Sequence, residues 1–172
     1  MRLLAQLAAA LLLVVFLAVL SGSAASDNGA AVAAVSDVRV ALAVVEGHRT
    51  TNSPLHVIIE NASGEPQSHF EEWNSWGYGN LTVEWTDAAG NTGKVAKVPG
   101  VWTVNFPSTV TLQPGDALVR EVSFDSKLWQ GWPEVPSGAT LTLQVTYHSS
   151  GEPAADGWTG SVTAKVQTVL FR

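Results

Sequence analysis

The sequence contains no cysteine. The chain therefore forms no disulfide, offers no thiolate to a metal ion, and lacks the residue that carries the lipid of a lipoprotein. Basic residues are also few, with nine Lys and Arg scattered among fifteen Asp and Glu. Because binding to phosphates requires clustered Lys and Arg, neither nucleic acid nor an anionic membrane surface is expected as a partner.

The common catalytic motifs are missing as well. We find no Gly-x-Ser-x-Gly elbow, no phosphate-binding glycine loop and no His-Glu-x-x-His helix. No two of the four histidines lie at ligand spacing on one predicted element, and His56 and His148 are predicted to face solvent. Glu71 and Glu72 are the one adjacent acidic pair, but sugar hydrolysis needs two carboxyls held about 5–9.5 Å apart across a substrate. We therefore expect a protein that is not an enzyme and holds no cofactor or metal.

The one long apolar run is at the N-terminus. Met1-Arg2 is followed by apolar residues from Leu3 to Leu20, interrupted by Gln6, and then by small residues from Ser21 to Ser26. This order is that of a signal peptide over residues 1–25, cleaved near Ala25, which predicts a secreted or periplasmic protein. The alternative is an uncleaved membrane anchor, since 18 residues fall within the roughly 17–25 that span a bilayer. The small residues favour cleavage, which leaves a chain of net charge −7 with no further membrane segment.

Residues 26–36 are small and weakly patterned, and we predict a flexible leader there. From residue 37 onward, short runs rich in Val, Thr, Leu and aromatic residues alternate with Gly, Pro, Asn and Asp, which is typical of an all-β protein. Residues 62–79 and 99–108 are predicted loops, and residues 125–132 one helical turn. About eight strands are expected: 38–46, 54–61, 80–86, 92–98, 109–112, 117–124, 138–148 and 158–171.

The simplest fold for these strands is an antiparallel β-sandwich of the immunoglobulin-like kind over residues 37–172, with a closed barrel as the alternative. Three features carry a resemblance: an Asn61-Ala62-Ser63 corner, a turn at residues 112–116, and Pro136-Ser137-Gly138 before a strand ending at Tyr147. In these the chain resembles bacterial exported immunoglobulin-like and fibronectin-type-III-like domains. The resemblance implies a fold and carries over no catalytic residue.

Two local patterns have ordinary explanations. Asp87 and Asn91 are the best candidates for a Ca²⁺ site, but the hairpin turn at residues 87–91 accounts for both. Asn61-Ala62-Ser63 and Asn80-Leu81-Thr82 fit the glycosylation pattern, which matters only in a eukaryotic secretory pathway.

The aromatic residues have an unusual distribution. Of the seven Trp, only Trp85 falls on a clear inward strand position, and three segments between the main strands, 69–80, 101–106 and 127–132, hold most of the other rings. Rings beside amides and acids suit the stacking of a sugar or the anchoring of a protein partner. The alternative is that the loops fold back and fill the open ends of the core. The candidate ligand-binding residues are Trp73, Trp76, Tyr78, Glu71, Glu72 and Trp102.

The leading hypothesis is an exported, non-enzymatic domain with an interaction or structural role outside the cytoplasm, where its partner is a protein or a glycan. One alternative is a carbohydrate-binding module that uses the aromatic loop residues. A second alternative is an inhibitor or regulator of an extracellular enzyme. The sequence predicts no particular oligomeric state.

Overall fold

The computed structural model describes residues 37–43, 50–51, 53–124, 127–150 and 156–172. The chain divides into two units, residues 1–34 and 35–172, and the fold below belongs to the second. The predicted signal peptide, the predicted leader and the end of the first predicted strand, residues 44–46, lie outside the described residues.

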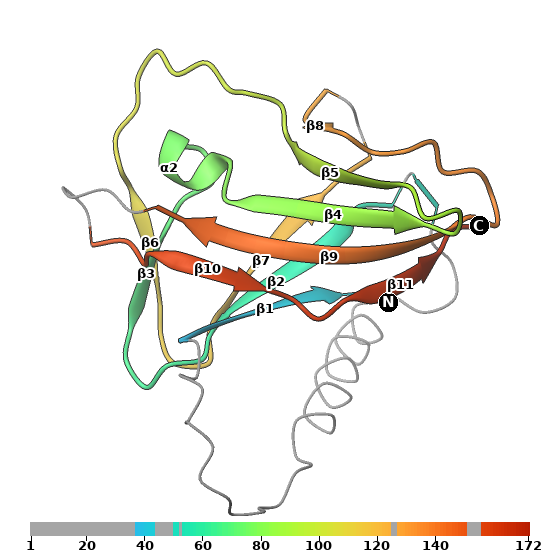
Figure 1. The fold of residues 1–172 in the computed structure, drawn as a ribbon. Helices are drawn as coiled ribbons and strands as arrows, with labels where there is room; N and C mark the ends of the chain where they lie inside the picture. The colour runs from blue at the N-terminus through green and yellow to red at the C-terminus, as the bar shows by residue number, and fades with distance from the viewer. Residues whose placement is uncertain (1–36, 44–49, 52, 125–126, 151–155) are drawn as a thin grey trace, which may run out of the picture. The chain divides into compact units, whose positions relative to one another are not determined.

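The described chain is mostly β-strand, which confirms the all-β prediction. Three antiparallel sheets are present in it (Figure 1). A three-stranded sheet has the order β1-β2-β7, a six-stranded sheet has the order β10-β9-β4-β5-β8 with β11 also on β9, and β3 pairs with β6. The strands are β1 Val38–Ala43, β2 Leu55–Asn61, β3 Gln67–Phe70, β4 Leu81–Asp87, β5 Thr92–Lys97, β6 Thr109–Leu112, β7 Ala117–Val122, β8 Trp129–Gln130, β9 Thr140–Ser149, β10 Gly160–Thr163 and β11 Gln167–Leu170.

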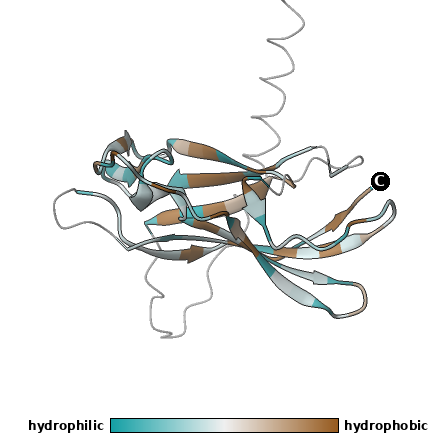
Figure 2. Cartoon of the chain, turned by 90° about the horizontal axis from the view of Figure 1, so that it is seen from above, coloured by the Kyte–Doolittle hydropathy of each residue, from teal (hydrophilic) through white to brown (hydrophobic). Residues whose placement is uncertain are grey.

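Apolar side chains from the two larger sheets form one core. Alternate residues of β2 and of β9 are buried, as their two-residue periodicity predicts. In Figure 2, which colours each residue by hydropathy, apolar and hydrophilic bands alternate along the strands. Each fully buried Val, Leu or Ile contributes about 1.5–3 kcal/mol to folding. The core includes Val38, Val40, Leu42, Leu55, Val57 and Ile59 from one sheet and Leu81, Val83, Val95, Leu141, Leu143, Val145 and Tyr147 from the other.

Two segments that were not predicted to contain strands do contain them. The predicted loop at residues 62–79 contains strand β3 and a one-turn helix, α2, Ser75–Tyr78. The predicted helical turn at residues 125–132 is wrong where the structure describes it, because Trp129–Gln130 forms β8 and pairs with Ala96 and Lys97 of β5. Both strands are too short to show a two-residue periodicity in the sequence, so they are identified only by their pairing with other strands.

The closing strand predicted over residues 158–171 is interrupted by a β-bulge. Thr163 pairs with Thr146 of β9, whereas Gln167 pairs with Leu143, so the strand carries one more residue than β9 over this interval. A one-residue shift exchanges the two faces of a strand. Val162 and Ala164 face the core, whereas Val166 and Thr168, which unbroken alternation would place on the same face, are exposed, and Val169 and Phe171 are buried instead.

The predicted corner at Asn61 joins the three-stranded sheet to the β3–β6 pair. The Asn61 side chain is fully buried, and its Nδ2 donates hydrogen bonds to the carbonyl oxygens of Glu65 and Leu112, at 2.8 and 3.0 Å. Opposite it, Gly115 has a φ of +84°, as the predicted turn requires, and its N–H donates to the Asn61 carbonyl. Asn61 is therefore a structural residue, and its amide is not available for glycosylation.

Candidate binding site

The segment between β3 and β4 folds against the segment between β5 and β6. Asn74 is fully buried and caps α2, because its Oδ1 accepts hydrogen bonds from the backbone N–H groups of Trp76 and Gly77. Its Nδ2 donates to the Ser108 carbonyl at 2.9 Å, and the Ser75 N–H donates to Asn105 Oδ1 at 3.1 Å. The two predicted loops thus form one hydrogen-bonded unit.

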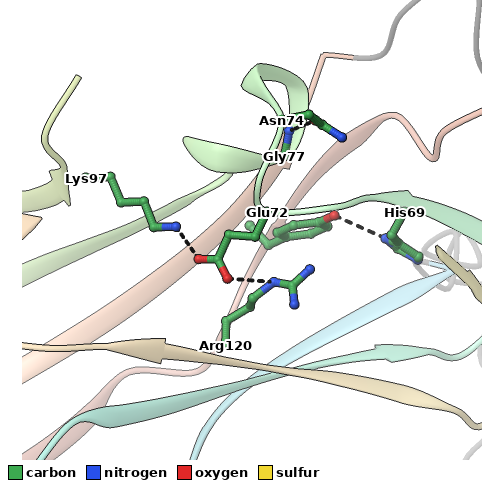
Figure 3. Close-up of polar contacts among 7 residues, drawn as sticks. His69, Glu72, Asn74, Gly77, Lys97 and Arg120 are labelled. Atoms are coloured by element: carbon green, nitrogen blue, oxygen red, sulfur yellow. Dashed lines mark hydrogen bonds and ion pairs between the residues drawn. The ribbon is translucent and has the colours of Figure 1, made fainter. Parts of the chain in front are cut away.

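The neighbouring carboxylates of this unit lie in different environments. Glu72 forms ion pairs with Lys97 of β5 and, at 3.5 Å, with Arg120 of β7 (Figure 3). Glu71 instead accepts hydrogen bonds at its Oε2 from Ser108 Oγ at 2.6 Å and from Trp73 Nε1 at 3.0 Å. These two hydrogen bonds lower the pKa of Glu71, and the bond from Ser108 has the larger effect. Each carboxylate therefore has its own partners, although the two residues are adjacent in the chain.

Glu72 connects the loop unit to both of the larger sheets, because Lys97 comes from the six-stranded sheet and Arg120 from the three-stranded one. The Lys97 side chain is 5% exposed. Its ammonium nitrogen lies 4.4 Å from the centre of the Tyr78 ring and 5.5 Å from that of Trp129. Glu72 itself is 33% exposed and has two cationic partners, so the network stabilises the position of the loop unit by less than the roughly 3–5 kcal/mol typical of a fully buried ion pair.

A second buried polar group lies beside this network. His69 of β3 is fully buried, and its Nδ1 shares a hydrogen bond of 3.1 Å with Tyr147 Oη (Figure 3). Its ring also stacks on Trp158 with the centroids 5.9 Å apart. Burial, and to a smaller extent the positive charge of Arg120, lowers the pKa of His69 to about 4, so this histidine is neutral at pH 7. His148 is exposed, and His56 is partly exposed with its Nε2 3.5 Å from Glu121 Oε1 at the surface, which agrees with the prediction that both face solvent.

The six predicted binding residues divide into exposed and half-buried ones. Trp73 is 47% exposed and Trp102 is 36% exposed. Trp76 is half-buried and stacks on Phe70, with the ring centroids 6.4 Å apart. Tyr78 is also half-buried, because its hydroxyl donates to the Val98 carbonyl and its ring meets Trp102 edge to face. Glu71 lies beside Trp73, and Glu72 belongs to the ion-pair network underneath.

Phe106 was not among the candidate binding residues predicted from the sequence, yet it lies beside one of them. It is 54% exposed and packs edge to face against Trp73, with the centroids 4.8 Å apart and the planes at 70°. Val101 and Val104 are exposed beside it in the chain. The sequence does mark this segment, because residues 98–115 include no charged residue. We call Trp73, Val101, Trp102, Val104 and Phe106 the aromatic surface.

Other tryptophans fill the core, as the alternative interpretation predicts. Trp129 is fully buried, and Trp132 stacks on Phe124 with the centroids 4.2 Å apart. Trp158 stacks on Tyr147 at 5.5 Å. Core filling and surface exposure therefore both occur, on different rings.

The remaining candidates are Asp87 with Asn91, and Asn80. The carboxylate of Asp87 accepts hydrogen bonds from the backbone of Ala89 and Asn91 and from the Asn91 side chain, and these bonds, led by that side chain, lower its pKa. The side-chain nitrogen of Asn80 is buried. Across the described residues, no three His, Asp or Glu side chains gather as metal ligands, and no helix has the length and hydrophobicity to cross a membrane.

Comparison of the chain with protein-family models, curated protein sequences and solved structures gave no significant match.

Proposed function

We propose that this chain is an exported, non-enzymatic β-sandwich domain of the immunoglobulin-like kind, which binds a protein partner outside the cytoplasm through the aromatic surface. Export is supported by the charged, apolar and small segments of residues 1–26. The immunoglobulin-like arrangement is supported by two antiparallel sheets that contribute to one core.

The observation that carries the binding role is the exposure of the aromatic surface. Five large apolar residues on two neighbouring segments are between 36% and 92% exposed. All of them except Trp73 lie in the run without charged residues, 98–115. Within this set Trp73 and Phe106 are in direct contact, exposed apolar patches mark interaction sites, and Trp is prominent among the residues that dominate binding energy. The hydrogen bonds of Asn74 and the ion pairs of Glu72 hold both segments in place, which lowers the entropy lost on binding.

Carbohydrate binding is the second candidate. It is favoured by the exposed ring of Trp73 next to the carboxylate of Glu71. It is disfavoured by the arrangement of the rings, because Trp76 stacks on Phe70 and Phe106 stands at 70° to Trp73. A flat platform of two parallel rings is therefore not formed by these residues.

The proposal is tested on the full chain, expressed with its N-terminal segment and recovered from the medium or the periplasm. N-terminal sequencing is expected to begin at Ser26; an intact N-terminus on protein found only in the cytoplasm would contradict export. The exported protein is then immobilised and exposed to envelope and medium proteins of its source organism. We expect a partner that is captured by the wild type, lost with Trp73→Ser or Phe106→Ser, and kept with Val119→Ser, which changes an exposed apolar residue of β7.

Capture that is the same for all four proteins would contradict a role for the aromatic surface. A glycan array probed with the same proteins tests the second candidate, and binding there that depends on Trp73 would replace the protein partner. If the captured partner is an extracellular enzyme and loses activity when bound, the binding role is that of an inhibitor.

A further inference from the structure

One corner of the aromatic surface combines two aromatic rings with a carboxylate. Trp73 and Phe106 are each about half exposed, and their planes meet at 70°. Glu71 is held at the edge of Trp73 by the indole N–H, at 3.0 Å, and by Ser108 Oγ, at 2.6 Å. Both bonds go to Oε2 of Glu71. We call these three residues the outer corner.

The same combination occurs inside the protein, where it holds a cation. The Lys97 ammonium lies over the rings of Tyr78 and Trp129 and pairs with Glu72. Two rings and one carboxylate there surround one ammonium group (Figure 3 shows the ion pair). The interior site therefore shows that two rings and a carboxylate hold an ammonium group of the chain itself in this fold.

The outer corner has side chains of the same kinds, but no cation in contact with its carboxylate: the positive charge of Arg120 contributes to lowering the pKa of Glu71 only from beyond ion-pair distance. Among the described residues, no Lys, Arg or His nitrogen lies within ion-pair distance, 4.0 Å, of Glu71. Aromatic faces attract ammonium groups through the negative potential of the ring, and the carboxylate adds a full charge. Resting on the proposed function, we infer that the outer corner binds the ammonium group of a lysine side chain on the protein partner.

The charge of the chain favours this source of ammonium over a lipid headgroup. The net charge is −6 for the full sequence, which attracts a basic protein surface. A choline or ethanolamine headgroup presents a similar cation, but its phosphate would approach Glu71 and an acidic domain. The inferred ligand is therefore a lysine of a basic partner, and the headgroup is a separate arm of the test.

The test is a titration of the exported protein, labelled with ¹⁵N, in which the indole N–H resonance of Trp73 is followed. Its assignment comes from the Trp73→Phe variant. The probes are Nα-acetyl-lysine methylamide, the uncharged Nα-acetyl-norleucine methylamide, and phosphocholine. We expect a saturable shift with the lysine compound in the millimolar range, and binding at least about 5-fold weaker with the norleucine compound.

Two variants and one matched control identify the binding residues. Glu71→Gln keeps an oxygen for Trp73 and Ser108 but loses the charge, and Phe106→Leu removes one ring. Each is expected to weaken lysine binding about 2- to 5-fold, since an exposed cation–π contact is worth about 0.5–1 kcal/mol and 1.4 kcal/mol is tenfold. Glu65→Gln removes the same charge from an exposed site before β3 and is expected to leave binding unchanged. Thermal unfolding of each variant verifies that it is folded.

Several results would overturn the inference while leaving the proposed function in place. Equal binding of the lysine and norleucine compounds would mean that the corner recognises apolar groups. Tighter binding of phosphocholine would assign the corner to a headgroup. Absence of any shift, while a partner is still captured through Trp73 and Phe106, would show that the surface binds without a cation. Absence of both the shift and the capture would overturn the proposed function as well.

Discussion

His69 makes the stability of this protein depend on pH. The histidine is fully buried in β3, and its pKa is lowered from 6.5 to about 4. Between these two values the unfolded chain binds a proton that the folded chain does not. Stability is therefore highest above pH 6.5 and falls as the pH decreases toward 4. With 1.36 kcal/mol per pKa unit, His69 accounts for a loss of about 2 kcal/mol between pH 7 and pH 4.5.

The assay is urea unfolding of the exported protein at pH 7, 5.5 and 4.5, followed by tryptophan fluorescence. The His69→Asn variant is expected to be less stable at pH 7, because it leaves space beside Tyr147 and Trp158, but its stability should fall by about 2 kcal/mol less than that of the wild type. Glu71 and Asp87 also lose stabilising interactions in acid, since their pKa values are lowered. Their contributions are common to both proteins and cancel in the difference.

The exposed His148 serves as the control, and His148→Asn should follow the wild-type curve. If His69→Asn loses as much stability between pH 7 and 4.5 as the wild type, the histidine does not titrate as its burial requires. The assignment of acid sensitivity to His69 would then be wrong.

Three further predictions concern stability and use the same unfolding assay. Lys97→Met should lower the free energy of unfolding by about 2–4 kcal/mol, because Glu72 keeps only Arg120 as an ion-pair partner among the described residues. The control is Lys94→Met, at an exposed lysine, which should change the free energy of unfolding by less than about 0.5 kcal/mol. Equal effects of the two would show that the network is not stabilising. Asn61→Ala should lower the free energy of unfolding by about 2–4 kcal/mol, since the carbonyl oxygens of Glu65 and Leu112 lose the hydrogen bonds from the Asn61 amide. A loss of less than about 1 kcal/mol would contradict the structural role of Asn61. Gly131→Ala should cost more than Gly90→Ala: both have a positive φ, but a Cβ at Gly131 would lie 2.1 Å from the Lys94 carbonyl oxygen, while one at Gly90 meets nothing within 4 Å.

Sequence reasoning succeeded where a strand is long and one of its faces is buried. β9 is ten residues long, and its inward Leu141, Leu143, Val145 and Tyr147 follow from alternation alone. It failed at the bulge before β11, where one extra residue exchanges the faces. Nothing in the local pattern marks that extra residue, because Val166 and Val169 are the same residue type.

The adjacent pair Glu71-Glu72 shows the same limit at the candidate site. The sequence shows two identical acids beside a tryptophan. The fold turns Glu72 toward Lys97 and Arg120, which lie 25 and 48 positions later in the chain, and leaves Glu71 at the surface with Trp73. Identical residues acquire different roles because partners distant in sequence determine their environment.

The sequence by itself determined the all-β class, because hydrophobic alternation and turn residues are local properties. It also determined the concentration of aromatic residues in three segments between the main strands and the absence of charge from residues 98–115. Only the tertiary structure decided which rings fill the core and which face solvent. That choice depends on the space left between sheets whose strands are far apart in the chain, and Trp129 occupies it while Trp73 and Phe106 remain exposed.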